Sequence, residues 1–407
     1  MRKTSLKDYM QEFLTKEEFD LAPRSFEVVG DIAIIEVPEE LISKEKQIGE
    51  SVLKVNSSIK TVLKKSGIHG GEFRTQNLEF VAGENKKETE YVENGIKLKL
   101  NPEIVYFSAK LSTERETLMG KLAPENRILT MFSGCGPYSL VALKKQPNLA
   151  RVDSIELNPE GHKYALENLS LNKNLLKKSE FYKNLIEFLR ENKLPVKEKE
   201  LISNLNKLRI HFICADVKSE VKKFKLENRN DYVESSDNFM FELEPAKAFE
   251  KLKNLPENSR LYIEKESISN PIPYAYFLVM FAEKFEYVLY DKNENTYRFF
   301  DDFNKGYLLN FFEGISIENL TRYDEIYMPL PKDAWQFLDS AFEVVAKNGI
   351  IHMYDFLDEE EIETGSKKKV LDVAKKLNRK VEIIETRKVG QYSPRKYRVC
   401  CDFKVLD

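Results

Sequence analysis

The 407-residue sequence has few cysteines, one tryptophan and no long apolar run. Its four cysteines, Cys135, Cys214, Cys400 and Cys401, follow neither the spacing of a zinc site nor that of a disulfide framework. We therefore expect free thiols in a reducing cytoplasm and no bound metal. No apolar stretch approaches the roughly 18 residues that span a membrane, and the first residues lack the apolar core of a signal peptide. These absences disfavour a membrane or secreted protein.

The sequence also lacks a large excess of charge of one sign. It holds 64 Lys and Arg against 67 Asp and Glu, which gives a net charge of −3. Nucleic-acid-binding proteins usually show a basic excess, so the overall charge gives no support to that function, although basic residues can still gather on one face. The length favours two domains, or one core with large insertions.

Residues 1–100 have the pattern of a small α+β domain. Two short apolar strands are expected within Ser25–Val37, around a turn at Gly30. Apolar residues at helical spacing predict a helix over Gln47–Lys64. Three further strands are expected over Phe73–Ala82, Thr89–Glu93 and Ile96–Leu100.

From Arg127 onward strands and helices alternate, which predicts a Rossmann-like, doubly wound α/β domain over residues 101–407. Two stretches, near 173–207 and near 218–322, interrupt the alternation and are interpreted as insertions. The expected strands are Ile128–Phe132, Val152–Leu157, Ile210–Ala215, Glu325–Met328, Gly349–Phe356, Val381–Thr386 and Arg395–Val405. The expected helices are Tyr138–Lys145, Pro159–Asn172, Asp333–Ala346 and Lys367–Leu377.

The first strand–turn–helix unit of this domain is a candidate ligand site. Gly134 and Gly136 leave room for a ligand beside the backbone, and the next helix begins with free N–H groups. The second strand ends at Glu156, where a carboxylate can accept hydrogen bonds from ribose hydroxyls. The third ends at Asp216, where an acid can meet an adenine amino group. Since ligands bind at the carboxyl ends of such strands, we expect an adenosine-containing cofactor.

Three alternatives to this interpretation exist. The glycines can simply make a tight turn, and Glu156 can be a solvent-facing strand end. A nicotinamide dinucleotide is a third, but its G-x-G-x-x-G spacing is absent, because the turn continues Gly136-Pro137-Tyr138-Ser139.

Several stretches together resemble the archaeal/eukaryotic tRNA (guanine-37-N1)-methyltransferases, a class I family that uses S-adenosylmethionine. They occur in the family's order and cover most of the chain outside the insertions and the N-terminal region. The matching stretches are GEFRT (71–75), VYFSAKLSTER (105–115), MFSGCGPYSL (131–140), IELNP (155–159), ENLSLN (167–172), MPLP (328–331), GIIHMYDF (349–356) and YSPRKYRVCCDF (392–403).

The resemblance implies a monomeric cytoplasmic enzyme that methylates N1 of guanosine 37 and binds the tRNA anticodon stem-loop. Glu114 would remove the N1 proton, and Arg74 would oppose charge that develops on O6. Without the resemblance, Glu114 is an acid favoured at a helix N-terminus and Arg74 an ordinary strand charge. The expected cofactor-binding residues are Tyr106, Phe132, Ser133, Gly134, Gly136, Glu156, Asn158, Asp216 and Pro331. The expected substrate-binding residues are Lys110, Arg115, Arg395 and Lys396.

The sequence departs from the family at several positions. Thr130 stands where the family has Asp, Lys110 where it has Arg, and Pro329 where it has the Asn that would hold the target base. We also expect this chain to lack the separate N-terminal domain that relatives place against the outer corner of tRNA. Two other functions therefore stay open: an aminocarboxypropyl transferase of the wybutosine pathway, and a catalytically weakened tRNA-binding protein. The basic, aromatic segment 388–398 fits either RNA contact or a solvated hairpin.

Overall fold

The computed structural model describes residues 5–67, 70–224, 227–229, 248, 252–255, 260–264, 271–281, 283–284, 286–291, 296–300, 305–312 and 319–407. The chain divides into two compact units. The first unit comprises Met1–Thr117, Ser133–Val141 and Glu156–Asn172, and the second comprises Leu118–Phe132, Ala142–Ile155 and Lys173–Asp407. In the described part of the chain, no helix is both long enough and apolar enough to cross a membrane.

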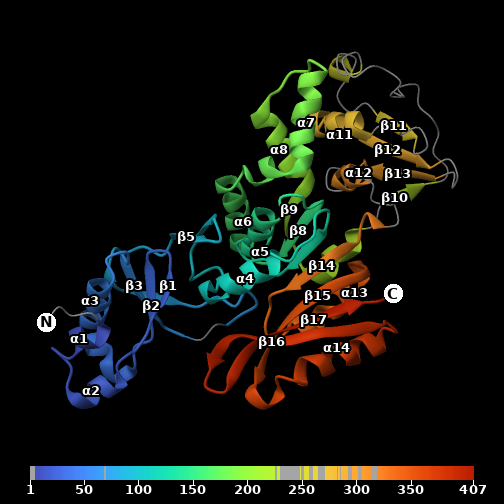
Figure 1. Cartoon of the computed structure of the whole chain (residues 1–407). Helices are drawn as coiled ribbons and strands as arrows, with labels where there is room; N and C mark the ends of the chain where they lie inside the picture. Colours follow the sequence, from blue (N-terminus) through green and yellow to red (C-terminus); the bar gives the residue numbers. More distant parts are fainter. Residues whose placement is uncertain are drawn as a thin grey trace. The chain divides into compact units, whose positions relative to one another are not determined.

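The first unit opens with a four-stranded sheet in the order β1-β2-β3-β4, which Figure 1 draws in blue. Strands β1 (Glu27–Val29) and β2 (Ile32–Ile35) form the expected hairpin. Strand β3 (Thr61–Lys65) runs parallel to β2 and antiparallel to β4 (Leu78–Gly83). The helices α1 (Leu6–Met10), α2 (Lys16–Leu21) and α3 (Glu45–Val55) precede β3, and α1 and α3 bury Leu6, Met10, Ile48 and Val52 in one apolar core with this sheet.

The helix expected over residues 47–64 is wrong in its second half. Helix α3 ends at Val55, and Thr61–Lys65 forms strand β3. The Asn56 side chain accepts the Ser58 N–H at 3.0 Å, a local turn that competes with further helix. The β-branched Thr61 and Val62 then pair with β2.

A second hairpin of the first unit, β5 (Thr89–Glu93) with β6 (Ile96–Leu100), confirms both expected strands. Asn94 and Gly95 at its tip have φ of 47° and 78°, the left-handed pair that tight hairpins require. Helix α6 (Pro159–Leu171) lies along β6, where Asn168 binds the backbone N–H and C=O of Lys99 at 2.6 and 3.1 Å. The Asn168 amide thus takes the place of a neighbouring strand at this point of the β6 edge.

The second unit contains a seven-stranded sheet in the order β16-β17-β15-β14-β7-β8-β9. Read from β9 and numbered along the chain, the order is 3-2-1-4-5-7-6, a Rossmann-like order in which the sequence of strands reverses direction between β7 and β14. The central strands β8, β7, β14 and β15 are parallel, as expected, but β17 runs antiparallel to both β15 and β16. The strands are β7 (Arg127–Met131), β8 (Arg151–Glu156), β9 (Ile210–Cys214), β14 (Tyr323–Met328), β15 (Val345–Asp358), β16 (Val381–Ser393) and β17 (Lys396–Val405).

One face of this sheet is covered by helices within the second unit. Helices α13 (Leu338–Val344) and α14 (Gly365–Lys376) run along its red end in Figure 1. Their apolar side chains share a core with strand residues and with the short α9 (Val217–Glu220). Its central members are Leu129, Met131, Ile326, Met353, Phe403, Leu338, Phe342, Val370 and Val217.

The two stretches interpreted as separate insertions pack against each other. Helices α7 (Glu180–Glu191) and α8 (Glu198–Arg209) contact α11 (Pro271–Phe281), and α8 also contacts α12 (Lys305–Phe312). The rings of Phe188 and Tyr276 lie 5.9 Å apart across this contact. A small sheet, β10-β13-β12-β11, accompanies these helices (Figure 1). Its strands are β10 (Glu227–Arg229), β11 (Arg260–Glu264), β12 (Glu286–Asp291) and β13 (Thr296–Phe300); much of 218–322 lies outside the described residues.

Phe342 tests the core of the second unit. The ring is 2% exposed and meets Phe403 of β17 at 5.9 Å. Phe342→Ala should lower the free energy of unfolding by about 3–5 kcal/mol, because truncation leaves a cavity beneath the sheet. Urea titration followed by fluorescence of Trp335, the single tryptophan, measures this. Leu371→Ala on the exposed side of α14 is the matched control, and an equal loss there would contradict the packing described.

Candidate functional site

The glycine turn after β7 has an unusual backbone. Phe132, Gly134 and Gly136 all have positive φ, of 60°, 56° and 83°. Such a conformation costs a non-glycine residue about 1–3 kcal/mol, and it concentrates at functional sites. A Cβ added at Gly134 would lie 3.2 Å from the backbone oxygen of Tyr106, so the turn closely approaches that segment. Ser133 is 4% exposed, and its hydroxyl has no hydrogen-bond partner among the described residues.

Glu156 joins this turn to the end of β8. One carboxylate oxygen accepts the Gly134 N–H at 2.6 Å, and the other accepts the Asn158 N–H at 2.7 Å. Burial raises the pKa of Glu156, while the N–H groups of Asn158, Gly134 and Leu157 act in the opposite direction. A carboxylate offers about four acceptor sites, so two backbone N–H bonds do not saturate it. The expected glycine turn and acid therefore lie in direct contact.

Asn158 connects the same corner to the segment that carries Tyr106. Its side-chain oxygen accepts the Glu160 N–H at 3.0 Å and so caps α6, as expected. Its side-chain N–H₂ donates to the Ile104 carbonyl at 2.7 Å. Gly161 lets the first turn of α6 approach, since a Cβ there would lie 3.2 Å from Glu156 Cγ. Residues 104–106, the glycine turn and the start of α6 thus form one hydrogen-bonded corner.

Arg115 corrects an expectation. We expected it to contact substrate, but it is 1% exposed and makes a bidentate ion pair with Glu93 of β5. Both contacts, Nε to Oε1 and Nη2 to Oε2, measure 2.5 Å, and Nη2 also donates to the Ser108 carbonyl at 3.1 Å. A guanidinium closed off in this way cannot reach an RNA phosphate. No local sequence pattern links Glu93 to a residue 22 positions later, so the sequence does not predict this pair.

The two expected catalytic residues belong to the first unit. Glu114 lies in the first turn of α4 (Ser112–Met119) and is half-buried. Arg74 was expected on a strand, but it lies in the turn before β4, with φ of 52°. The Gly70–Thr75 bridge closes that turn. Lys110 is exposed on a single 3₁₀ turn, Ala109–Leu111.

The remaining expected residues belong to the second unit. Phe132 packs edge-on against Phe337 at 4.8 Å, and Pro331 is buried after the end of β14. Asp216 is exposed and accepts the Ser219 N–H at 3.0 Å, so its observed contact is the N-cap of α9. Arg395 and Lys396 form the tip of the β16–β17 hairpin, where Arg395 has φ of 60°.

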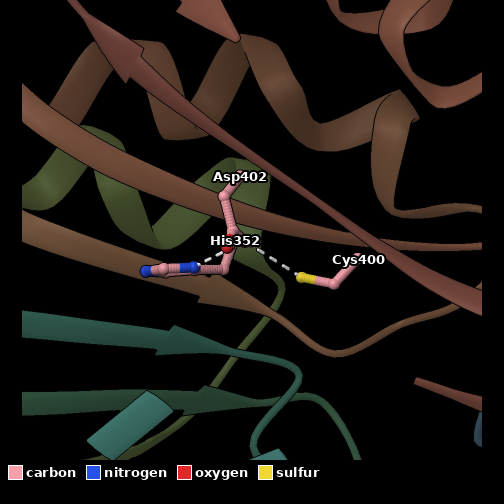
Figure 2. Close-up of side chains that lie close together, drawn as sticks. All are labelled: His352, Cys400 and Asp402. Carbon is pink, nitrogen blue, oxygen red and sulfur yellow. Dashed lines mark hydrogen bonds and ion pairs between the residues drawn. The ribbon is translucent and has the colours of Figure 1, made fainter. Parts of the chain in front are cut away.

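A buried polar cluster of residues that were not among the expected site residues lies on β15 and β17. Figure 2 shows the side chains of His352, Cys400 and Asp402 gathered, with their ligand-type atoms within 4.8 Å of one another. His352 Nδ1 contacts Asp402 at 2.8 Å, and its Nε2 contacts Glu325 at 2.9 Å. Arg387 also pairs with Asp402. Because both imidazole nitrogens are already bonded and Asp402 is neutralised, hydrogen bonding accounts for this cluster without a metal.

The charges of this cluster reinforce one another. Burial alone would lower the pKa of His352, but hydrogen bonds to Asp402 and Glu325 outweigh it and raise the pKa to about 9. Burial likewise opposes the charge of Asp402, yet His352 and Arg387 lower its pKa to about 2. The neighbouring Tyr327 stacks on the imidazole at 4.5 Å and donates to Glu325. His352 is therefore held as an imidazolium between two carboxylates.

A seven-stranded sheet of this order, with a glycine turn and a carboxylate at neighbouring strand ends, defines a Rossmann-like methyltransferase fold. Residues 6–86 match the TYW2 N-terminal domain, and residues 89–213 match the TRM5/TYW2 methyltransferase domain. The chain belongs to the TRM5/TYW2 methyltransferase family, as a divergent member.

Curated relatives differ in how much of the chain they match. The tRNA (guanine(37)-N(1))-methyltransferase Trm5b of Pyrococcus abyssi is 39% identical over 193 residues, which are 47% of this chain and 55% of the relative. The tRNA (guanine(37)-N(1))/4-demethylwyosine(37)-methyltransferase Taw22 of Nanoarchaeum equitans is 28% identical over 376 residues, which are 92% of this chain and 97% of the relative. The chain thus spans about half of the first relative and nearly all of the second.

Solved structures share the fold. The crystal structure of Pyrococcus abyssi Trm5b has a TM-score of 0.60 and 25% identity, and the match covers 100% of this chain and 82% of that one. The structure of P. horikoshii TYW2 in complex with MeSAdo has a TM-score of 0.55 and 18% identity, over 98% of each chain. These likenesses agree with the α/β architecture expected from the sequence.

The His352 cluster makes the stability of the fold depend on pH. The pKa of His352 is higher in the folded chain than the ordinary 6.5, so its contribution is complete below about pH 6.5 and is lost as the pH rises through about 9. The free energy of unfolding should fall by up to about 3 kcal/mol across that range, and much less in His352→Gln. Urea titrations followed by Trp335 fluorescence measure this. Parallel pH profiles for both proteins would contradict a charged His352.

Proposed function

We propose that this chain transfers a methyl group from S-adenosylmethionine to N1 of guanosine 37 in tRNA. The observation that carries the proposal is the contact between Gly134 and Glu156, which lies inside the stretch that matches the TRM5/TYW2 methyltransferase domain. It is supported by relatives whose names state this activity, in Pyrococcus abyssi and Nanoarchaeum equitans. The tRNA anticodon stem-loop is the proposed partner.

The residues of the corner suit S-adenosylmethionine, which supplies an electrophilic methyl group when bound. The positive φ at Gly134 and Gly136 and the unpartnered, buried Ser133 hydroxyl offer backbone space and a polar contact. Glu156 takes the ribose hydroxyls with the acceptor capacity that its two backbone bonds leave. Tyr106, Phe132, Asn158, Asp216 and Pro331 complete the proposed cofactor set.

The reaction at guanine N1 requires a proton acceptor and a group that opposes charge on O6. Glu114 takes the N1 proton, for which its half-buried position at the start of α4 leaves it accessible. Arg74 stabilises the negative charge that develops on O6, since a guanidinium stays protonated throughout. The target base is drawn out of its stack to reach them, and Lys110, Arg395 and Lys396 contact the RNA backbone.

A second candidate function uses the same site on a different base or group. The match of residues 6–86 to the TYW2 N-terminal domain, and Pro329 in place of the family Asn, favour a reaction on a tricyclic guanine derivative or transfer of the aminocarboxypropyl group. Mass spectrometry of nucleosides from incubated tRNA separates these products, since a methyl group adds far less mass than an aminocarboxypropyl group.

Glu156→Gln tests the cofactor corner directly. The amide nitrogen of Gln cannot accept a hydrogen bond, so either the Gly134 or the Asn158 N–H loses its partner. Affinity for S-adenosylmethionine should fall about 10- to 100-fold, the equivalent of one or two charged hydrogen bonds. Calorimetric titration measures it. Glu160→Gln, an exposed acid four residues later, should bind as wild type does; equal affinity in both variants would remove Glu156 from the site.

Glu114→Gln tests the base on unmodified tRNA transcripts that carry G, A, C or U at position 37. The wild type should methylate only the G37 transcript, and Glu114→Gln should lower the rate about 10²- to 10⁴-fold while cofactor binding persists. Glu116→Gln, an exposed acid on the same helix, is the matched control. Equal labelling of all four transcripts would remove the N1-guanine assignment, and an unchanged rate in Glu114→Gln would remove the base.

A further inference from the structure

The buried pair of Glu93 and Arg115 joins three separate segments of the first unit. Glu93 ends strand β5, Arg115 lies in the first turn of α4, and the guanidinium also binds the Ser108 carbonyl at 3.1 Å. Phe107 and Ser108 are therefore both in contact with the Arg115 guanidinium. The next residue back along α4 is Glu114, the proposed base.

The pair is closed off on every side that the structure describes. The side chains of Arg115 and Glu93 are 2% and 1% exposed. The guanidinium lies over two rings, at 5.3 Å from Phe107 and 5.7 Å from Tyr138. Tyr138 is the second residue of α5 (Pro137–Lys145), the helix after the glycine turn, so the same cation also contacts the cofactor corner. One guanidinium thus touches the segments that carry Tyr106, Glu114 and Gly136.

The hairpin supplies a second tether to α4. Asn94, next to Glu93, donates from its side chain to the Ser112 carbonyl at 3.0 Å, where α4 begins. Two neighbouring residues at the tip of the β5–β6 hairpin therefore fix the first turn of α4 from one side. The orientation of Glu114 follows from that turn, because a side chain in a helix projects from a fixed backbone.

We infer that Glu93 and Arg115 are positioning residues that hold Glu114 and residues 106–108 in the arrangement that methyl transfer requires. The inference rests on the proposed function. A buried ion pair generally contributes little net stability, because the cost of desolvating the charges offsets their attraction. Stability of the fold is therefore a weak explanation for the pair of Glu93 and Arg115. A displacement of about 1 Å at a reacting group costs about 10²-fold in rate, which gives positioning a measurable consequence.

The test compares Arg115→Lys and Glu93→Gln with a variant of a second bidentate pair, whose acid is less buried. Arg127 and Asp324 form another bidentate pair, with contacts of 3.0 and 2.8 Å, at the amino-terminal ends of β7 and β14. Asp324→Asn should therefore destabilise the fold without changing kcat. Arg115→Lys keeps the charge but loses the two-pronged contact, and Glu93→Gln keeps the shape but loses the charge.

Single-turnover methylation of the G37 transcript is measured for the folded fraction of each protein. Arg115→Lys and Glu93→Gln should lower kcat about 10- to 100-fold, with the KM for tRNA within about twofold of wild type. A rise in the KM for tRNA at unchanged kcat would overturn the inference, since it would place Arg115 in RNA contact. A rate loss no larger than that of Asp324→Asn would also overturn it.

Amide hydrogen exchange keeps the inference separate from the proposed function. If the wild type fails to methylate any transcript, the proposed function falls, but exchange still decides whether the pair holds these segments. Amides of residues 106–115 should exchange at least about tenfold faster in Glu93→Gln than in wild type, and at the wild-type rate in Asp324→Asn. Unchanged exchange in Glu93→Gln would overturn the positioning role by itself.

Discussion

The hydrogen bonds from Gly134 and Asn158 to the Glu156 carboxylate are the constraint on which the site depends. They tie the turn after the first strand of the Rossmann-like sheet to the end of the second. Each backbone bond that Glu156 accepts also fixes a carboxylate oxygen in direction. Preorganisation of this kind reduces the ordering that a ligand must impose when it binds. The left-handed backbone at Gly134, which glycine adopts without steric strain, aims its N–H at this acid.

Several buried charges elsewhere among the described residues have an oppositely charged partner. Arg115 meets Glu93, and His352 meets both Asp402 and Glu325. Asp153, which is fully buried, contacts Arg151 at 2.7 Å and His211 at 2.8 Å. Since breaking such a pair costs far more than forming it gains, these groups specify where strands and helices meet rather than how stable the fold is.

The corner of Gly134 and Glu156 could be predicted from the sequence, because the ends of parallel strands meet at one edge and each end is visible as a change of pattern. The burial of Arg115 and its ion pair with Glu93 could not be predicted. Its partner Glu93 reaches it only through docking of a hairpin onto α4, and no local pattern encodes that contact. The error in the second half of the helix predicted over 47–64 has a different cause. Apolar residues keep their spacing across the Asn56-Ser57-Ser58 turn, and periodicity outweighed the turn residues in our prediction.

The two insertions pack together against the first residue of strand β8. Tyr307 of α12 lies under the Arg151 guanidinium, with 3.8 Å from its carbon to the ring centre, and Arg151 is the first residue of β8. Gly306 permits this approach, because any Cβ there would collide with the Leu208 carbonyl of α8. Asp153 holds Arg151 on the same strand and contacts His211 of β9. The inserted helices therefore hold the first residue of the strand that ends at Glu156, and Asp153 links that residue to β9.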